Sequence, residues 1–285
     1  MTDAADEGAP VHRPPRAVAM PPILTSRPGE VRPSAPPPSP SSPSPDARVG
    51  GGDAKGRDVG VIVVAGGKGT RTGADELKQF RWVAGKPMLL HSIQAFMAHP
   101  AVACVVAVLP RSHAADPPPW IFQCDLERLL ISTGGRERGD SVYNGLEDLP
   151  PEIGTVLVHD AARPLVTDDT IARVIDAARS GRAVTAALPV VDTLKEVDAD
   201  GRIVRTVDRS MLWRAQTPQG FPRTVLEDAH RAARRDGIAA TDDAGLCERL
   251  GIPVFVVRGS ERAMKVTEAS DFARAEALSM LTEPE

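Results

Sequence analysis

A glycine-rich segment with two cations follows the first strongly apolar stretch of the chain. From Gly60 to Phe80 the sequence reads GVIVVAGGKGTRTGADELKQF. Glycines directly after a strand let backbone N–H groups approach phosphate oxygens closely. Arg71 and Lys78 beside such a loop could stabilise the charge of a transferring phosphoryl group. The segment matches neither the P-loop nor the GxGxxG pattern. A tight turn with two solvated cations has the same composition, so both interpretations stay open at this point.

A carboxylate and three further cations occur later in the chain. Asp160 follows an apolar segment in the motif VHDAARP, so we expect it at the carboxyl end of a strand, where open α/β sheets bind their ligands. A carboxylate there could hold Mg²⁺ directly or through water, or it could cap the following loop. Arg163, Arg209 and Lys265 also follow apolar segments and could attract anionic substrates. His159 is interpreted as a packing residue.

Apolar strands that alternate with amphipathic helices must position these side chains. Strands are predicted at Val59–Val64, Val102–Leu109, Leu129–Ser132, Thr155–Val158, Ala183–Val190 and Pro253–Val257. Helices are predicted around Leu89, Ile93, Phe96 and Met97, from Ser141 onward, along Ile171, Val174, Ile175 and Ala178, and at Ser270–Leu281. This order predicts an α/β fold with a mostly parallel, twisted sheet flanked by helices.

One segment interrupts the alternation of strands and helices. Residues Val190 to Asp208 read VVDTLKEVDADGRIVRTVD, with turn residues from Asp198 to Gly201 between two β-rich arms. This pattern predicts an inserted β-hairpin arm at about 190–210. An isolated two-stranded ribbon is only marginally stable in water, so we expect the arm to pack on something outside its own domain.

Composition separates a leader from the folded part of the chain. Thirteen of the 27 prolines lie in the first 45 residues, and such a segment cannot bury enough apolar surface to offset its ordering entropy. We therefore expect a disordered Pro/Ser-rich leader at 1–56 and a folded domain at 57–285. A net charge of −4 without a basic block argues against nucleic-acid binding, and no apolar run is long enough to span a membrane. Three widely spaced cysteines and the lack of a secretory signal favour a reducing, cytoplasmic location.

Ordered motifs along residues 58–281 resemble one enzyme family. GGKGTR, LKQF, GKP and LLHSI resemble the nucleotidyltransferases that join a sugar or polyol phosphate to a nucleoside triphosphate. GGRERGDSV, VHDAARP, DTLK, TVDR, TPQGF, TDDAG and MKVT are similar, in this order, to the 2-C-methyl-D-erythritol 4-phosphate cytidylyltransferase family of the non-mevalonate isoprenoid pathway. The resemblance implies a Rossmann-like nucleotidyltransferase fold and transfer of a cytidylyl group from CTP to 2-C-methyl-D-erythritol 4-phosphate, with release of pyrophosphate.

The resemblance also implies site residues, a metal and a partner. Nucleotide contacts are implied for Ala65, Gly66, Gly67, Gly69, Gly134, Gly135, Ser141, Asp160 and Ala161. Catalytic roles are implied for Arg71, Lys78, Arg209 and Lys265, and acceptor contacts for Arg163, Thr193, Thr217 and Thr241. Asp160 would hold Mg²⁺. In this family Thr193 and Arg209 lie on the arm and reach the partner's active site, which implies a homodimer. The attacking phosphate is already ionised at neutral pH, so no general base is expected.

Other interpretations remain beside this one. Leu77 replaces a proline that many family members have, and Arg136 stands where an acidic residue often occurs. These departures put the mobility of the Lys78 loop and one contact to the cytosine base in question.

Ribitol 5-phosphate cytidylyltransferase is the alternative function with the same chemistry and another acceptor. A non-catalytic nucleotide-binding module is a second alternative, and guanylyl or adenylyl transfer is disfavoured by the motifs after Gly134.

Overall fold

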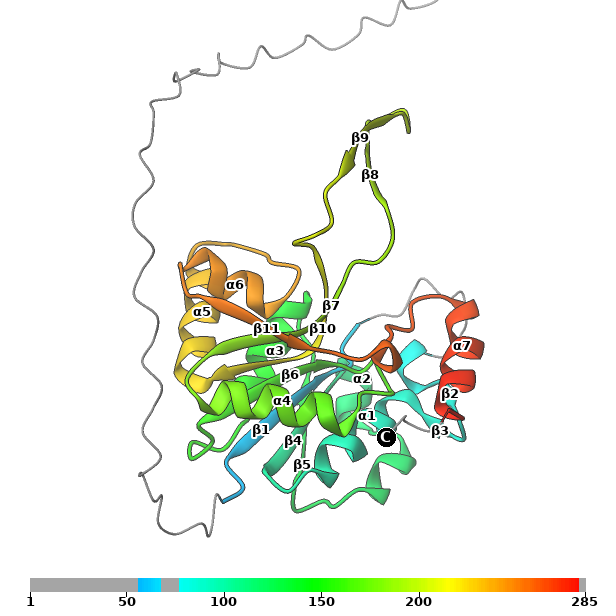
Figure 1. Cartoon of the computed structure of the whole chain (residues 1–285). Helices are drawn as coiled ribbons and strands as arrows, with labels where there is room; N and C mark the ends of the chain where they lie inside the picture. Colours follow the sequence, from blue (N-terminus) through cyan, green and yellow to red (C-terminus); the bar gives the residue numbers. More distant parts are fainter. Residues whose placement is uncertain (1–55, 68–76, 282–285) are drawn as a thin grey trace, which may run out of the picture. The chain divides into compact units, whose positions relative to one another are not determined.

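Seven strands form one sheet in the computed structural model, which describes residues 56–67 and 77–281. Their order across the sheet is β11-β7-β10-β6-β1-β4-β5 (Figure 1). The strands are β1 (Val59–Val64), β4 (Val102–Leu109), β5 (Leu129–Thr133), β6 (Thr155–Asp160), β7 (Ala183–Pro189), β10 (Trp213–Pro222) and β11 (Val254–Arg258). Of these seven, β10 alone runs antiparallel to its two neighbours, β6 and β7. The predicted mostly parallel sheet is confirmed.

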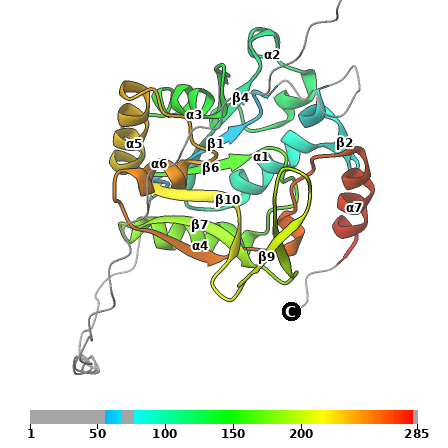
Figure 2. The same cartoon turned by 90° about the horizontal axis from the view of Figure 1, so that it is seen from above.

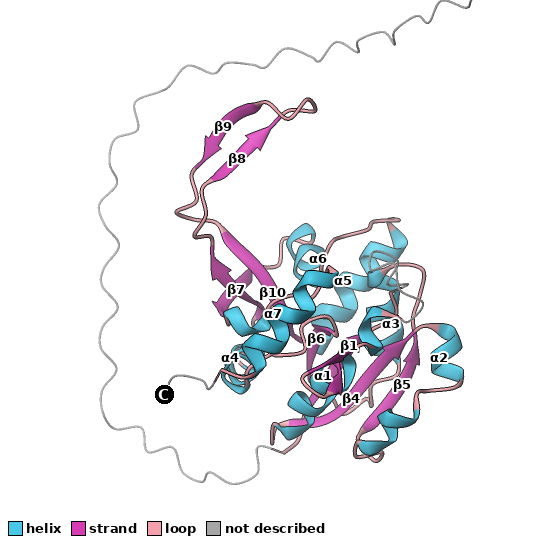
Figure 3. Cartoon of the chain, turned by 90° about the vertical axis from the view of Figure 1, so that its right-hand side faces the viewer, coloured by secondary structure: helices cyan, strands magenta, loops and turns pink. Residues whose placement is uncertain are grey.

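Helices lie on both faces of the sheet (Figure 2). One face packs against α1 (Met88–Ala98) and α4 (Asp168–Arg179), and the other packs against α3 (Arg138–Glu147), α5 (Arg223–Arg235) and α6 (Asp243–Arg249). Further elements of the described chain are α2 (Arg111–Ala115), α7 (Ala269–Ser279), the short 3-10 helices η2 (Lys78–Phe80), η3 (Pro119–Gln123) and η4 (Glu261–Ala263), and the small β2–β3 hairpin (Trp82–Val83 and Lys86–Pro87). Figure 3 shows these helices and strands by type.

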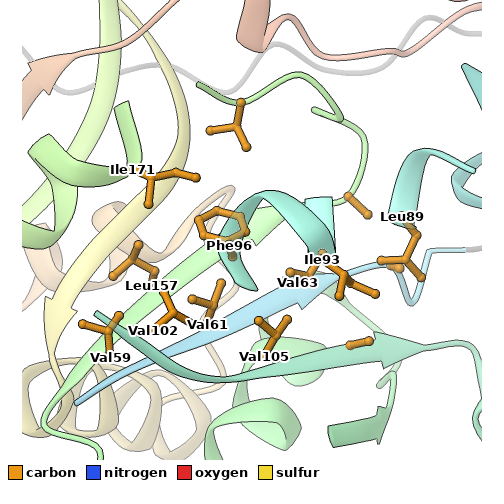
Figure 4. Packing of buried hydrophobic residues seen from close by; sticks show 14 of the residues in the cluster. Val59, Val61, Val63, Leu89, Ile93, Phe96, Val102, Val105, Leu157 and Ile171 are labelled. Carbon is orange, nitrogen blue, oxygen red and sulfur yellow. The ribbon is translucent and has the colours of Figure 1, made fainter. Parts of the chain in front are cut away.

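The central strand β1 is buried on both faces, which is why its sequence is continuously apolar. Val59, Val61 and Val63 pack toward α1 and α4 (Figure 4), while Ile62 packs toward α3 and α5. Gly145 lets α3 approach the sheet closely, because a Cβ there would lie 2.7 Å from Cγ2 of Ile62. This approach holds the last turn of α3 directly against β1.

Most element boundaries agree with the sequence predictions. The strands at Val59–Val64 and Val102–Leu109 are confirmed at both ends, and the other predicted strands and the closing helix differ by one or two residues at an end. The helix predicted from Ser141 begins earlier, at Arg138, because Glu137 and Asp140 form a capping box around its first turn. The predicted leader lies outside the described residues up to position 55.

Sequence analysis missed β10, α5 and α6. The segment WRAQTPQGFP of β10 contains two prolines, a glycine and four polar or charged side chains, a composition typical of loops. Its place between β6 and β7 is set by pairing on both sides, with Gln219 opposite both Val158 and Thr185. This one antiparallel strand carries polar side chains to the edge of the site described below.

The predicted hairpin arm is confirmed as β8 (Leu194–Val197) and β9 (Ile203–Val207), which pair with each other in a separate two-stranded sheet. In Figure 1 it extends away from the seven-stranded sheet. Gly201 has φ +80°, a conformation that favours glycine in the turn. The adjacent residues Ile203 and Val204, whose side chains alternate across the ribbon, are both more than half exposed. Both faces of the arm therefore present apolar surface.

Candidate active site

A cavity of about 870 Å³ lies at the carboxyl ends of β1, β5 and β6. This edge of an open α/β sheet is where such folds bind their ligands. Ten of the residues named by the sequence analysis line it: Ala65, Gly66, Gly67, Lys78, Gly134, Gly135, Ser141, Asp160, Ala161 and Lys265. Gln79, Arg111, Arg136, Glu137 and Arg138 are also part of its lining. Residues from distant parts of the chain thus meet in one cavity.

Two glycine loops form one wall of the cavity by touching each other. A Cβ on Gly134 would lie 2.9 Å from the Cα of Gly66, closer than real Cβ atoms approach backbone. A Cβ on Gly66 would lie 3.1 Å from the Oγ of Ser141. That hydroxyl accepts a hydrogen bond from the N–H of Gly135 at 3.0 Å and donates to the carbonyl of Glu137 at 3.1 Å. Glycine is therefore required here by close backbone approach.

A side chain of the single-turn helix η2 holds the first glycine loop, residues 65–67, in place through hydrogen bonds. The Nε2 of buried Gln79 donates to the carbonyl of Ala65 at 2.6 Å and to that of Gly67 at 3.1 Å. The neighbouring Lys78 donates from Nζ to the carbonyl of Val266 at 2.8 Å. Lys78 thus lies at the cavity while Gln79 shapes the loop that forms its wall.

Asp160 is held between two cations at the end of β6. Its Oδ1 accepts from Nε of Arg138 at 3.1 Å, and its Oδ2 accepts from Nζ of Lys265 at 2.7 Å. Burial alone would raise the pKa of this carboxyl group, but Arg138 and Lys265 together lower that pKa far below its ordinary value. Asp160 is therefore a carboxylate over the whole physiological pH range.

The cavity is electropositive despite this carboxylate. Five cationic side chains line it, against the two carboxylates of Asp160 and Glu137, which gives a formal charge of +3. Such an excess attracts a polyphosphate, and each close opposite-charge pair is worth on the order of 4 kcal/mol at an effective dielectric near 20.

His159 and Thr217 support the Asp160 backbone from the buried side. The N–H of Asp160 donates to Oγ1 of Thr217 at 3.1 Å, and that hydroxyl lies 3.0 Å from Nδ1 of His159. His159 Nε2 faces the carbonyl of Arg163 at 3.1 Å, so the proton of the neutral ring belongs on Nε2. Burial lowers the pKa of His159 to about 4. The interpretation of His159 as a packing residue agrees with its complete burial against Phe96.

The remaining residues named from the sequence lie elsewhere or outside the described ranges. Arg163 donates from Nη1 to the carbonyl of Ala263 at 2.7 Å and from Nη2 to that of Ala215 at 3.3 Å. Thr193 and Arg209 are exposed on the arm side of the molecule, and Arg209 donates to the carbonyl of Val191. Thr241 is exposed just before α6, and none of these residues lines the described cavity. Gly69 and Arg71 lie outside the described residues.

Sequence reasoning assigned no role to four polar or charged lining residues, Gln79, Arg111, Glu137 and Arg138. Two of these hold other parts of the site in place, Arg138 and Gln79. Both stand inside motifs that the sequence analysis singled out, GGRERGDSV and LKQF. The signal for Arg138 was the capping box of Glu137 and Asp140, which starts α3 at this arginine and places it at the cavity. Gln79 carried no comparable signal, because its partners are backbone carbonyls of a distant loop.

The donor set of the cavity fits a divalent cation that arrives with a nucleotide. Within residues 56–67 and 77–281, no group of three or more His, Cys, Asp or Glu side chains is placed to hold a metal ion. Mg²⁺ needs only one or two carboxylates when phosphate oxygens and water complete its shell. Asp160, ionised and 13 % exposed at the cavity, meets that requirement.

Fold and site together define an enzyme class. A mostly parallel sheet with glycine loops, lysines and an acidic strand end around one cavity is the arrangement of a nucleotidyltransferase. The family model for 2-C-methyl-D-erythritol 4-phosphate cytidylyltransferase matches residues 59–281. The chain belongs to this family and is a cytidylyltransferase.

Individual relatives agree with the family match. The chain is 43 % identical over 226 residues to the 2-C-methyl-D-erythritol 4-phosphate cytidylyltransferase of Pelotomaculum thermopropionicum, covering 77 % of this chain and 93 % of that one. It is 44 % identical over 227 residues to that of Streptomyces coelicolor, covering 76 % and 83 %. The crystal structure of the Thermus thermophilus enzyme matches with a TM-score of 0.67 and 37 % identity, over 79 % of this chain and 100 % of that one. In the part of this chain that is described, no helix is long and apolar enough to cross a membrane.

Proposed function

We propose that the cavity at the ends of β1, β5 and β6 is where a cytidylyl group passes from CTP to 2-C-methyl-D-erythritol 4-phosphate. The observation that carries this proposal is the convergence of both glycine loops, Lys78, Lys265 and Asp160 on one electropositive cavity. The glycine loops would bind the nucleotide through backbone groups, and the cations would let two mutually repelling anions approach.

The reaction needs positioning and charge stabilisation more than proton transfer. An oxygen of the acceptor phosphate attacks the α-phosphorus of CTP, a new P–O bond forms, and the bond to the β-phosphate oxygen breaks to release pyrophosphate. The attacking oxygen is already ionised, because the second pKa of a phosphate monoester is about 6. Lys78, together with Arg71, would stabilise the α-phosphate in the transition state, and Lys265 would meet the acceptor phosphate.

Mg²⁺ is part of the proposal, with Asp160 as its protein ligand. When bound, the ion would neutralise charge on the phosphate oxygens. Lys265 shares the carboxylate in the described structure through Oδ2, and its ammonium could turn to the acceptor phosphate once that oxygen is engaged. Asp160 would stay ionised throughout.

A homodimer through the hairpin arm is also proposed. Val191, Ile203, Val204 and Met211 on or beside β8 and β9 each expose more than half of their surface, which favours a protein partner over water. In a dimer the arm would carry Thr193 and Arg209 to the partner's cavity, where they would contact the acceptor.

We also propose a cytoplasmic location. Cys104, Cys124 and Cys247 are unpaired thiols, which supports this location.

The activity is tested by supplying purified protein with CTP, Mg²⁺ and one acceptor at a time. Pyrophosphate release should be faster with 2-C-methyl-D-erythritol 4-phosphate than with ribitol 5-phosphate. Faster release with ribitol 5-phosphate would transfer the proposal to that acceptor. Release with neither acceptor would support the interpretation as a nucleotide-binding module without turnover.

A further inference from the structure

One guanidinium joins the carboxylate of the proposed metal ligand to a second, deeply buried carboxylate. Arg138 donates from Nε to Oδ1 of Asp160 at 3.1 Å and from Nη1 to Oδ2 of Asp243 at 2.7 Å. These residues come from the start of α3, the end of β6 and the start of α6. The bridge thus ties three separate elements together at the cavity.

Asp243 is a fixed anchor for this bridge. Its side chain is 1 % exposed, and its Oδ1 lies 2.9 Å from Nε2 of His230 on α5. Its backbone N–H donates to Oε1 of Gln219 on β10 at 3.1 Å. Because both oxygens and the N–H of Asp243 are engaged, the position of its partner Arg138 is defined by the core of the protein.

The two cations on Asp160 differ in how they are held. Lys265 is 44 % exposed and approaches Oδ2 from the open side, while Arg138 is 24 % exposed and has its second carboxylate partner in the interior. A ligand at the cavity can therefore displace the ammonium of Lys265 without moving the guanidinium of Arg138.

We propose that Arg138, anchored by Asp243, is a positioning residue that fixes the carboxylate of Asp160 in the orientation that receives a metal–nucleotide complex. The inference rests on the proposed function, in which Asp160 meets that complex. Arg138 holds Oδ1 of Asp160 and thereby its side-chain rotamer. This leaves Oδ2 of Asp160 facing Lys265, whose ammonium a ligand can displace. Arginine is required because two different nitrogens of one rigid fork bond two carboxylates, which the single ammonium of a lysine does not reproduce.

The test compares Arg138→Lys and Arg138→Gln with a matched control in the full-length protein. The control is Arg128→Lys: Arg128 is also a partly buried arginine, but it donates to the carbonyls of Val102, Ala103 and Met97 at the opposite, amino end of the strands. Binding of Mn²⁺·CTP is measured by isothermal titration calorimetry without acceptor, together with kcat, KM for CTP and the thermal midpoint.

Both Arg138 variants should bind Mn²⁺·CTP about 10- to 100-fold more weakly, the usual effect of removing a group that orients a metal ligand. Arg128→Lys should lower the thermal midpoint and leave Mn²⁺·CTP binding unchanged. Wild-type binding in Arg138→Lys would overturn the inference, and so would an equal loss of binding in Arg128→Lys, because the loss would then follow general stability.

Asp243→Asn keeps the inference testable if Arg138→Lys does not fold. The asparagine can still accept one hydrogen bond from Arg138 but loses the charge, so Mn²⁺·CTP binding should weaken by up to about 10-fold. Unchanged binding in Asp243→Asn would refute the anchoring role. A wild-type protein that binds Mn²⁺·CTP and uses neither acceptor would refute the proposed function alone, since this binding needs no acceptor.

Discussion

The contact between the two glycine loops gives a sharp test of the site, through the substitution Gly134→Ala. The new methyl group would lie 2.9 Å from the Cα of Gly66 and 3.2 Å from the carbonyl oxygen of Leu109. Both neighbours are backbone atoms, which cannot rotate away. To reach an ordinary contact of about 3.4 Å or more, the loops after β1 and β5 must separate by about half an ångström.

Two effects of Gly134→Ala are expected in different measurements. Overpacking of this kind costs about 1–3 kcal/mol, which for a domain of this size lowers the thermal midpoint by roughly 2–12 °C. Displacement of a loop that binds the nucleotide should lower kcat/KM for CTP by about 10- to 100-fold. Calorimetry and steady-state pyrophosphate release measure the two effects.

Gly139→Ala is the matched control for this prediction. Gly139 belongs to the same motif and lies within α3, and a Cβ there meets no atom within 4 Å. Alanine should stabilise the helix by about 0.5–1 kcal/mol and leave kcat/KM unchanged. A Gly134→Ala enzyme with wild-type kcat/KM for CTP would show that the close approach of the loops does not shape the nucleotide site.

Three further predictions concern charge, pH and assembly. Lys78→Ala should lower kcat by about 10²- to 10³-fold and barely change CTP binding, because its contact would form mainly in the transition state; an unchanged kcat would remove Lys78 from that role. The pKa of His159 is near 6.5 in the unfolded chain but about 4 in the folded protein. The unfolded chain therefore binds this proton first, and the free energy of unfolding should fall by about 3 kcal/mol as the pH falls from 6.5 to 4. Denaturant titrations should show that the free energy of unfolding of His159→Gln depends less steeply on pH than that of the wild type. An equal dependence would contradict the low pKa of His159 in the folded protein. Mixing Arg209→Ala with Lys78→Ala should restore about a quarter of wild-type activity, because half of the dimers would be mixed with one intact site each; no recovery would mean that the arm serves its own subunit.

The local parts of the fold could be predicted because the signals for them are local. The apolar run at Val59–Val64 and the motif VHDAARP define a buried strand and an acidic strand end from a few consecutive residues. The hairpin arm was recognisable from its turn residues and its two β-rich segments. Strand β10 was not predicted because its prolines and glutamines are typical of a loop. It is a strand because it pairs with β6 and β7.

Most strands and helices, the glycine loops and most of the charged residues of the site can be named from the amino-acid sequence, because each is defined by neighbouring residues. Which of these side chains meet depends on tertiary packing. Arg138 contacts Asp160, 22 residues away, and Asp243, 105 residues away. The physical reason is that periodicity records which face of an element is buried, whereas an ion pair between α3, β6 and α6 depends on how the packed sheet brings their ends together.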